Sequence, residues 1–221
     1  MLNYDPRSPL IFIHVPKTAG QTVKSIAKAW FGREFYPHYF DESAGGLPPK
    51  RDFGALSHGG EACIYGHFNR LRGFGIEDYY PEAKQFVSIL RDPLEMAISS
   101  YFYTRTRTAV WKDQSRIPQG DLESYLTDTP LNMLNHFPRL VTPDNYKEII
   151  EKYFIYIGNT ENLLSSLQAL ATKLRKPLPN ELPIVNATTR AEYEISTDVV
   201  TRFKEKNKLE YLVYQYALEC R

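Results

Sequence analysis

Short runs of apolar residues alternate along this chain with segments in which apolar residues recur at helical spacing. Four runs are long enough for strands buried on both faces of a sheet, at residues 10–15, 62–67, 85–90 and 154–158. Helical spacing marks the segments at 22–30, 93–106, 163–174 and 197–220. Strands that alternate with helices form right-handed βαβ units. We therefore predict an α/β protein with a central, mostly parallel sheet flanked by helices.

The remaining segments carry weaker patterns. Residues 31–57 are predicted to form a loop, because Gly45-Gly46 and Pro48-Pro49 interrupt any regular spacing. Shorter helices are expected near 121–127, 131–136 and 143–153. Residues 178–196 are rich in proline and then polar. The sequence has no internal repeat and no low-complexity tract, so residues 1–221 are predicted to form a single domain.

Composition narrows the class of protein. A hydrophobic content of 43% and an aromatic content of 14% fit a globular domain with a substantial core. The net charge of +1 and the pI of about 7.7 predict affinity for neither nucleic acid nor a membrane surface. Cys63 and Cys220 fit no metal-ligand spacing and are too few for a disulfide framework. The polar start of the sequence has no signal-peptide pattern, and no apolar run approaches the roughly 20 residues of a membrane span. We therefore expect a cytoplasmic location.

One segment has the pattern of a phosphate-binding site. The apolar run at 10–15 leads into the short loop Pro16-Lys17-Thr18-Ala19-Gly20, and helical spacing begins at Thr22. The first amides of a helix have no partner within the helix, and the helix dipole places partial positive charge there. Such a helix end attracts anions. Lys17 adds a full charge, and Thr18 and Thr22 add hydroxyl donors.

The loop alone leaves alternatives open. Many α/β proteins begin with a strand, a turn and a helix that bind nothing, and a lysine in such a turn is a solvated charge. The loop also lacks the G-x-x-x-x-G-K-[ST] pattern, so an ordinary nucleoside-triphosphatase P-loop is not supported. However, Lys17, His67 and Arg91 each follow a different predicted strand. Because ligands bind at the carboxyl ends of parallel strands, these three residues are expected to converge on one site.

A second motif follows the third predicted strand. In Arg91-Asp92-Pro93, the aspartate is a suitable N-cap and the proline fits the first helical position, and Ser99 lies two turns further on. A guanidinium is a rigid fork of donors suited to a phosphate. The alternatives are an ion pair of Arg91 with Asp92 or Glu95, and a solvated or backbone-bonded hydroxyl for Ser99.

These motifs resemble the sulfotransferases that use 3′-phosphoadenosine 5′-phosphosulfate (PAPS), and in particular the carbohydrate branch that includes heparan sulfate 2-O-sulfotransferase. In that family a P-K-T-[AG]-[GS]-[TS] loop holds the 5′-phosphosulfate, and the matching segment here is 16–22. An R-D-P element followed by a helix serine holds the 3′-phosphate, as Arg91 and Ser99 would here. The segment 156–163 is similar to the family's F-x-G-x-x-E pattern, and 186–190 is similar to a further family loop.

The resemblance implies a P-loop-type sulfotransferase fold and transfer of the sulfuryl group of PAPS to an acceptor hydroxyl, on a carbohydrate. The product would be 3′-phosphoadenosine 5′-phosphate (PAP), and no metal would be needed. Lys17 would neutralise charge on the leaving phosphate, and His67 would be the catalytic base. The donor would be held by Lys17, Thr18, Ala19, Gly20, Gln21, Thr22, Arg91, Ser99 and Arg190.

Other residues compete with His67 for the role of base. His58, which has Glu61 near it in the sequence, is the main rival, and a carboxylate is another possibility. His14 is interpreted as a core histidine inside the first strand. His38 and His136 lie in segments without a clear pattern and are not favoured.

The acceptor and the function class also have alternatives. A basic segment with Arg105, Arg107, Lys112 and Arg116 suggests an acidic glycan acceptor, whereas a solvated loop is the other interpretation. A nucleotide kinase or NTPase would share the strand-loop-helix phosphate site but would need a carboxylate for Mg²⁺. A non-catalytic nucleotide-binding module would bind the nucleotide without turnover.

Overall fold

The computed structural model describes residues 1–41, 46–58, 60–106, 117–182 and 192–220. The strands form a five-stranded sheet with the order β2-β3-β1-β4-β5, and every pair is parallel. Their bounds are β1 Leu10–Ile13, β2 Phe35–His38, β3 Cys63–Gly66, β4 Phe86–Leu90 and β5 Phe154–Asn159. Every residue of β1, β3, β4 and β5 is buried, as expected for strands covered on both faces. The predicted α/β fold with a parallel sheet is confirmed.

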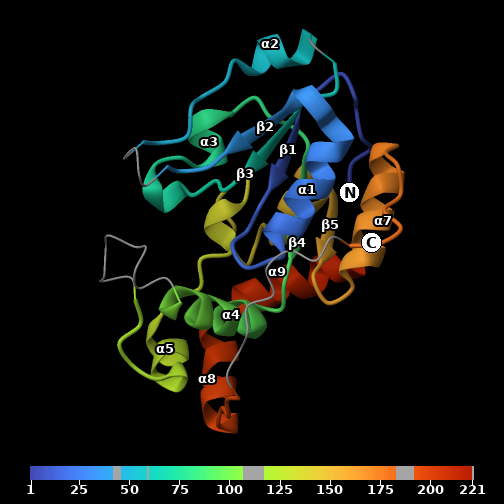
Figure 1. The fold of residues 1–221 in the computed structure, drawn as a ribbon. Coiled ribbons are helices and arrows are strands. Elements are labelled where there is room, and N and C mark those ends of the chain that lie inside the picture. The colour runs from blue at the N-terminus through green and yellow to red at the C-terminus, as the bar shows by residue number, and fades with distance from the viewer. Residues whose placement is uncertain (42–45, 59, 107–116, 183–191, 221) are drawn as a thin grey trace.

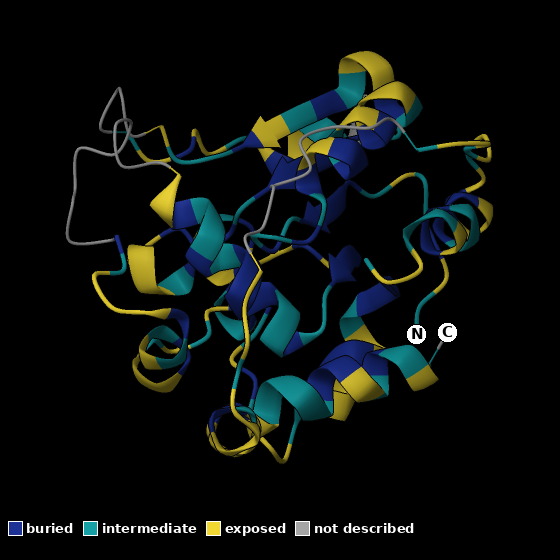
Figure 2. Cartoon of the chain, turned by 60° about the horizontal axis from the view of Figure 1, so that its bottom comes forward, coloured by how far each residue is buried: buried dark blue, intermediate teal, exposed yellow. Residues whose placement is uncertain are grey.

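Two groups of helices cover the two faces of the sheet (Figure 1). On one face lie α1 Gly20–Phe31 and α7 Leu163–Leu174, whose apolar stripes pack on β1, β3 and β5. The other face is covered by α2 Phe53–His58, α3 Ile76–Tyr79, α6 Tyr146–Tyr153 and α9 Lys208–Glu219. Figure 2 shows the consequence, with the buried residues gathered along the strands and the inner sides of these helices.

A third group of helices lies beyond the carboxyl edge of the sheet. Strand β4 runs directly into α4 Pro93–Arg105, which packs with α5 Leu122–Asp128 and α8 Thr197–Lys206 at the bottom of Figure 1. These helices share a small apolar cluster of their own, centred on Leu126 and Phe203. In the described part of the chain, short 3₁₀ turns lie at Gly32–Glu34, Arg70–Arg72 and Leu134–His136.

The structure corrects several predicted boundaries. The segment 31–57 is not all loop, because it holds β2 and α2. Pro37 lies in β2, and a proline is tolerated there because β2 is an edge strand. The first strand ends at Ile13 instead of residue 15, and the segment 131–136 forms only a 3₁₀ turn.

The predicted helix at 197–220 is two helices. The buried Asn207 separates α8 from α9, and its side-chain amide donates to the Phe203 carbonyl at 2.9 Å. Both helices contact α4, but only α8 packs against α5, whereas α9 packs against β5 and α6. Within the part of the chain that the structure describes, no helix combines the length and the apolar character needed to cross a membrane.

Gly66 is the position in the sheet where a side chain is least tolerable. A Cβ built there would lie 1.8 Å from the His38 carbonyl oxygen, a backbone atom of the paired strand β2. We expect Gly66→Ala to lower the free energy of unfolding by about 1–3 kcal/mol or more, measured by urea denaturation. Gly54→Ala is the control. Gly54 lies in the short helix α2, where alanine is favoured over glycine, and the nearest atom to its Cβ would be Asp52 Oδ1 at 3.3 Å, so this variant should not lower the free energy of unfolding. Equal stability of both variants would contradict the close pairing of β2 with β3.

Candidate active site

The turn between β1 and α1 has an unusual backbone. Lys17 and Ala19 both have positive φ angles, of 70° and 58°, which few residues other than glycine adopt. The Thr18 hydroxyl donates to the Val15 carbonyl at 2.8 Å and closes the turn. Ala19 occupies the N-cap position of α1 and makes no side-chain cap. The N-terminus of α1 therefore lacks an N-cap oxygen, as an anion-binding helix end requires.

Two aromatic side chains, of Tyr65 and His14, contact this turn at Gly20. The Tyr65 hydroxyl donates to the Gly20 carbonyl at 2.8 Å. A Cβ on Gly20 would lie 1.7 Å from Nε2 of His14, so only glycine leaves room for that imidazole ring. The start of α1 is therefore packed against His14, which follows β1, and Tyr65, which lies in β3.

The Arg91-Asp92-Pro93 motif begins α4 as predicted. The Asp92 carboxylate accepts from the amides of Leu94 and Glu95 at 2.9 and 3.1 Å, and Pro93 is the first helical residue. The carboxylate of Glu161, in the F-x-G-x-x-E-like segment, binds the same turn from the loop after β5. It accepts from the Asp92 amide at 3.0 Å and from the Tyr214 hydroxyl at 2.9 Å.

Arg91 connects α4 to the turn after β1. Its Nη1 lies 3.5 Å from the Lys17 carbonyl oxygen, and its Nη2 lies 3.0 Å from Glu95 Oε2. The ion pair with Glu95, which the sequence left open as an alternative, is therefore present. Ser99 lies further along α4 and is buried.

Lys17 also contacts α4. Its ammonium lies over the ring of Tyr103, 3.6 Å from the ring centroid. Lys17 and Arg91, which follow different strands, therefore lie at one place, beside the start of α1. Gln21 and Thr22 lie in the first turn of α1, and Thr22 is buried. Arg190 lies outside the described residues.

His67 follows β3 at the same edge of the sheet and has a defined tautomer. Its Nδ1 lies 2.6 Å from the His14 carbonyl oxygen. Because a carbonyl oxygen only accepts hydrogen bonds, Nδ1 carries the proton, and Nε2 of the neutral ring has the lone pair. The His67 ring stacks on the His14 ring at 4.3 Å between centroids and meets the Tyr39 ring edge-on at 4.9 Å.

The surroundings keep these imidazoles neutral. Burial lowers the pKa of His67 to about 4, against a smaller opposing effect of its bond to the His14 carbonyl, and the charge of Arg72 lowers that pKa further. Burial, and then the neighbouring His67, lowers the pKa of His136 to about 3. The pKa of His14 lies well below its ordinary value for the same main reason. At neutral pH His67 is therefore in the form that accepts a proton.

Several residues of this site were not predicted. His14 is not inside the strand, because β1 ends at Ile13, and its Nδ1 lies 3.0 Å from the Tyr39 hydroxyl. His136 lies 5.8 Å from His67 between ring centroids, although it was not favoured from the sequence. His38 is buried in β2 and stacks on Phe68.

Some predicted residues fall outside the described part of the chain. These are Arg107, Lys112 and Arg116 of the basic segment, the loop at 186–190, and the side chain of His58. Arg105 is described, and its Nη1 donates to the Tyr101 hydroxyl at 2.7 Å and to the Gly120 carbonyl at 3.3 Å. Among the described residues, no group of three or more His, Cys, Asp or Glu could hold a metal ion.

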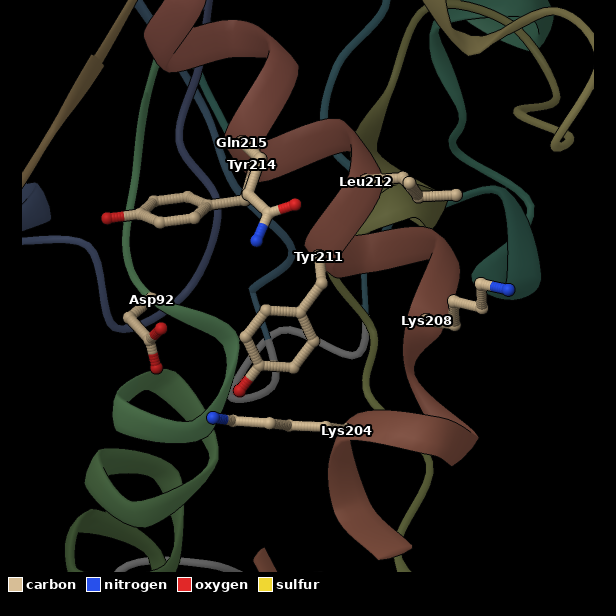
Figure 3. Close-up of a pocket in the computed structure, with 7 residues that line it drawn as sticks. All are labelled: Asp92, Lys204, Lys208, Tyr211, Leu212, Tyr214 and Gln215. Atoms are coloured by element: carbon tan, nitrogen blue, oxygen red, sulfur yellow. The ribbon is translucent and has the colours of Figure 1, made fainter. Parts of the chain in front are cut away.

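A pocket of about 440 Å³ adjoins the R-D-P turn at Asp92 (Figure 3). In that view the Lys204 side chain extends toward the Tyr211 hydroxyl. The lining residues come from the start of α4 and from α8 and α9: Asp92, Lys204, Lys208, Tyr211, Leu212, Tyr214 and Gln215. In the described part of the chain, this lining includes none of the residues predicted to bind the donor.

Comparison with known proteins identifies the family. A model of the Sulfotransferase family matches residues 1–217, so the chain belongs to the sulfotransferase family. The predicted resemblance to sulfotransferases is confirmed at this level, and the assignment to the carbohydrate branch stays a prediction. No curated protein matches the sequence.

Two solved structures are similar to this one. The crystal structure of mouse sulfotransferase SULT7A1 complexed with PAP has 12% sequence identity and a TM-score of 0.49, with 92% of this chain covered. The chain spans 66% of the length of that mouse protein. The sulfotransferase from Alicyclobacillus acidocaldarius has 16% identity and a TM-score of 0.48, with 93% of this chain and 96% of that chain covered.

Acidification should destabilise the fold through His38 and His136. Burial lowers their pKa values to about 4 and about 3, whereas an unfolded histidine titrates near 6.5. Below about pH 6.5 the unfolded chain binds more protons than the folded chain. The free energy of unfolding therefore decreases as the pH is lowered. Between about pH 7.5 and 5 we expect urea denaturation to show a loss of about 2 kcal/mol for each histidine. His38→Phe should remove its share of this loss, and an unchanged pH dependence in that variant would contradict the argument.

Proposed function

We propose that this protein is an O-sulfotransferase that moves the sulfuryl group of PAPS to a hydroxyl of a carbohydrate and releases PAP. The observation that carries the proposal is the meeting of Lys17, Arg91 and the uncapped start of α1 at the carboxyl edge of the sheet, where the neutral His67 also lies. Membership of the sulfotransferase family supports the same reaction.

The donor would span the turn after β1 and the side of α4. The 5′-phosphosulfate fits the start of α1, where Lys17, Thr18, Thr22 and the first amides of the helix supply positive charge and donors. The 3′-phosphate would be held by Arg91 and Ser99, with Arg190 as a further ligand. On donor binding, Arg91 would release the Glu95 carboxylate and bind the phosphate instead. A phosphate fits the two parallel donors of a guanidinium as well as a carboxylate does.

The residues have distinct roles in the transfer. Nε2 of His67 takes the proton of the acceptor hydroxyl, whose oxygen attacks the sulfur in line with the bond to the leaving phosphate. The new S–O bond forms as the bond between sulfur and the bridging oxygen breaks. Lys17 neutralises the negative charge that develops on this oxygen, and PAP leaves. The His14 carbonyl keeps the proton on Nδ1, so that Nε2 is always the accepting atom.

Cations and aromatic rings near His67 support an acidic glycan as the acceptor. The Lys24 ammonium lies 5.0 Å from the ring centroid of Tyr39, which itself contacts His67. The Arg72 guanidinium lies 4.2 Å from the ring centroid of Phe40. Rings of this kind stack on sugars, and the cations would attract carboxylate or sulfate groups.

Binding of the product tests the donor site. We expect calorimetric titration to show that PAP binds much more tightly than 5′-AMP or ATP. Arg91→Ala should weaken PAP binding by about 10- to 100-fold and Ser99→Ala by about 2- to 10-fold, as expected for a charged and a neutral hydrogen bond. Arg202→Ala is the matched control, since Arg202 also pairs with a carboxylate four residues away, at 2.7 Å, and should bind normally. Equal binding of ATP with magnesium-dependent hydrolysis would favour a kinase instead.

Two substitutions of His67 test the base. His67→Asn retains an N–H that can donate to the His14 carbonyl but lacks Nε2, whereas His67→Ala removes both. With radiolabelled PAPS and a panel of acidic glycans, both variants should lose about 10²- to 10⁴-fold in kcat, with PAP affinity within about 2-fold. The wild-type rate should fall only as pH drops toward about 4, because that is where His67 gains its proton. Full activity of His67→Asn would exclude His67 as the base and favour His58.

A further inference from the structure

Tyr103 lies on the face of α4 that meets the phosphate-binding turn. It is four residues after Ser99, and residues four apart share one face of a helix. The Lys17 ammonium lies 3.6 Å from the centroid of the Tyr103 ring. The other cation–ring distances among the described residues are 4.2–6.0 Å, so this contact is the closest of its kind there.

An aromatic ring suits this lysine better than a carboxylate would. The ring face attracts a cation through its quadrupole, but it carries no net charge and leaves the charge of the ammonium in place. An ammonium has three N–H donors directed to different sides, and a ring face contacts only one of those sides. The Lys17 backbone is fixed as well, by its positive φ of 70° and by the contact of its carbonyl with Arg91.

We propose that Tyr103 is a positioning residue that holds the Lys17 ammonium where the bridging oxygen of the donor binds. The inference rests on the proposed function, because it takes Lys17 as the residue that neutralises the leaving phosphate. A free lysine side chain loses much rotamer freedom when it is fixed on a ligand. The ring of Tyr103 restricts the Lys17 side chain before the donor binds. Less rotamer entropy is therefore lost on binding, and the charge is preorganised.

The ring and the hydroxyl of Tyr103 can be tested separately. Tyr103→Phe keeps the ring face, and we expect PAP affinity and kcat to stay within about 2-fold of wild type. Tyr103→Leu removes the ring but keeps an apolar side chain, and PAP affinity and kcat should each fall by about 2- to 30-fold, the range of a cation–π contact.

A double-mutant cycle tests whether the effect of Tyr103 acts through Lys17. In a Lys17→Met background, Tyr103→Leu should cause no further loss of PAP affinity. An equal loss in both backgrounds would show that Tyr103 contributes only to packing, and it would overturn the inference. A Tyr103→Leu variant that binds PAP and turns over like wild type would overturn it as well.

A measurement without any nucleotide separates this inference from the proposed function. In NMR spectra of lysine-labelled protein, the ring current of Tyr103 should shift the ε-methylene protons of Lys17 upfield. The shift should persist in Tyr103→Phe and disappear in Tyr103→Leu, while the Lys24 signal, from a lysine near Tyr39, stays unchanged in all three proteins. An unshifted Lys17 signal in the wild type would overturn the inference, whereas absence of PAP binding would overturn the donor assignment.

Discussion

The turn between β1 and α1 is the constraint on which the rest of this site depends. Its two non-glycine residues with positive φ each cost roughly 1–2 kcal/mol of backbone strain. One side chain within the turn, the Thr18 hydroxyl, and two from elsewhere, the Tyr65 hydroxyl in β3 and Arg91 after β4, offset that strain. The result is a helix start without an N-cap oxygen, next to a lysine that faces α4.

The same arrangement explains why the histidines near the turn are neutral. Three imidazoles, of His14, His67 and His136, lie close together, partly or wholly withdrawn from solvent, beside cations such as Lys17 and Arg72. A protonated ring there would lose its hydration and face like charges, so the neutral form is preferred. Because the His14 carbonyl fixes the tautomer of His67, the backbone at the end of β1 shapes both the turn before α1 and the proposed base.

The carboxyl edge is held together by polar contacts that link distant parts of the chain. Glu161, after β5, bonds to the start of α4 and to Tyr214 of α9. The R-D-P turn is therefore fixed by its own N-cap and by Glu161, which lies 69 positions after Asp92 in the sequence. Such a turn can present Arg91 with little freedom, as the proposed recognition of the 3′-phosphate would require.

The sequence by itself determined the parts of the protein that local chemistry controls. Buried runs specified β1, β3, β4 and β5, the Asp92-Pro93 pair specified the start of α4, and leucine spacing specified α7. The converging positions of Lys17 and Arg91 followed from parallel topology alone. Only the tertiary structure decided the edge strand β2, the break at Asn207, and the neighbours of the key side chains. The contacts of His67 with His14, of Arg91 with Glu95 and the turn, and of Lys17 with Tyr103 join different elements or depend on side-chain direction. No local pattern in the sequence encodes such contacts, because they arise only when the packed layers bring the elements together.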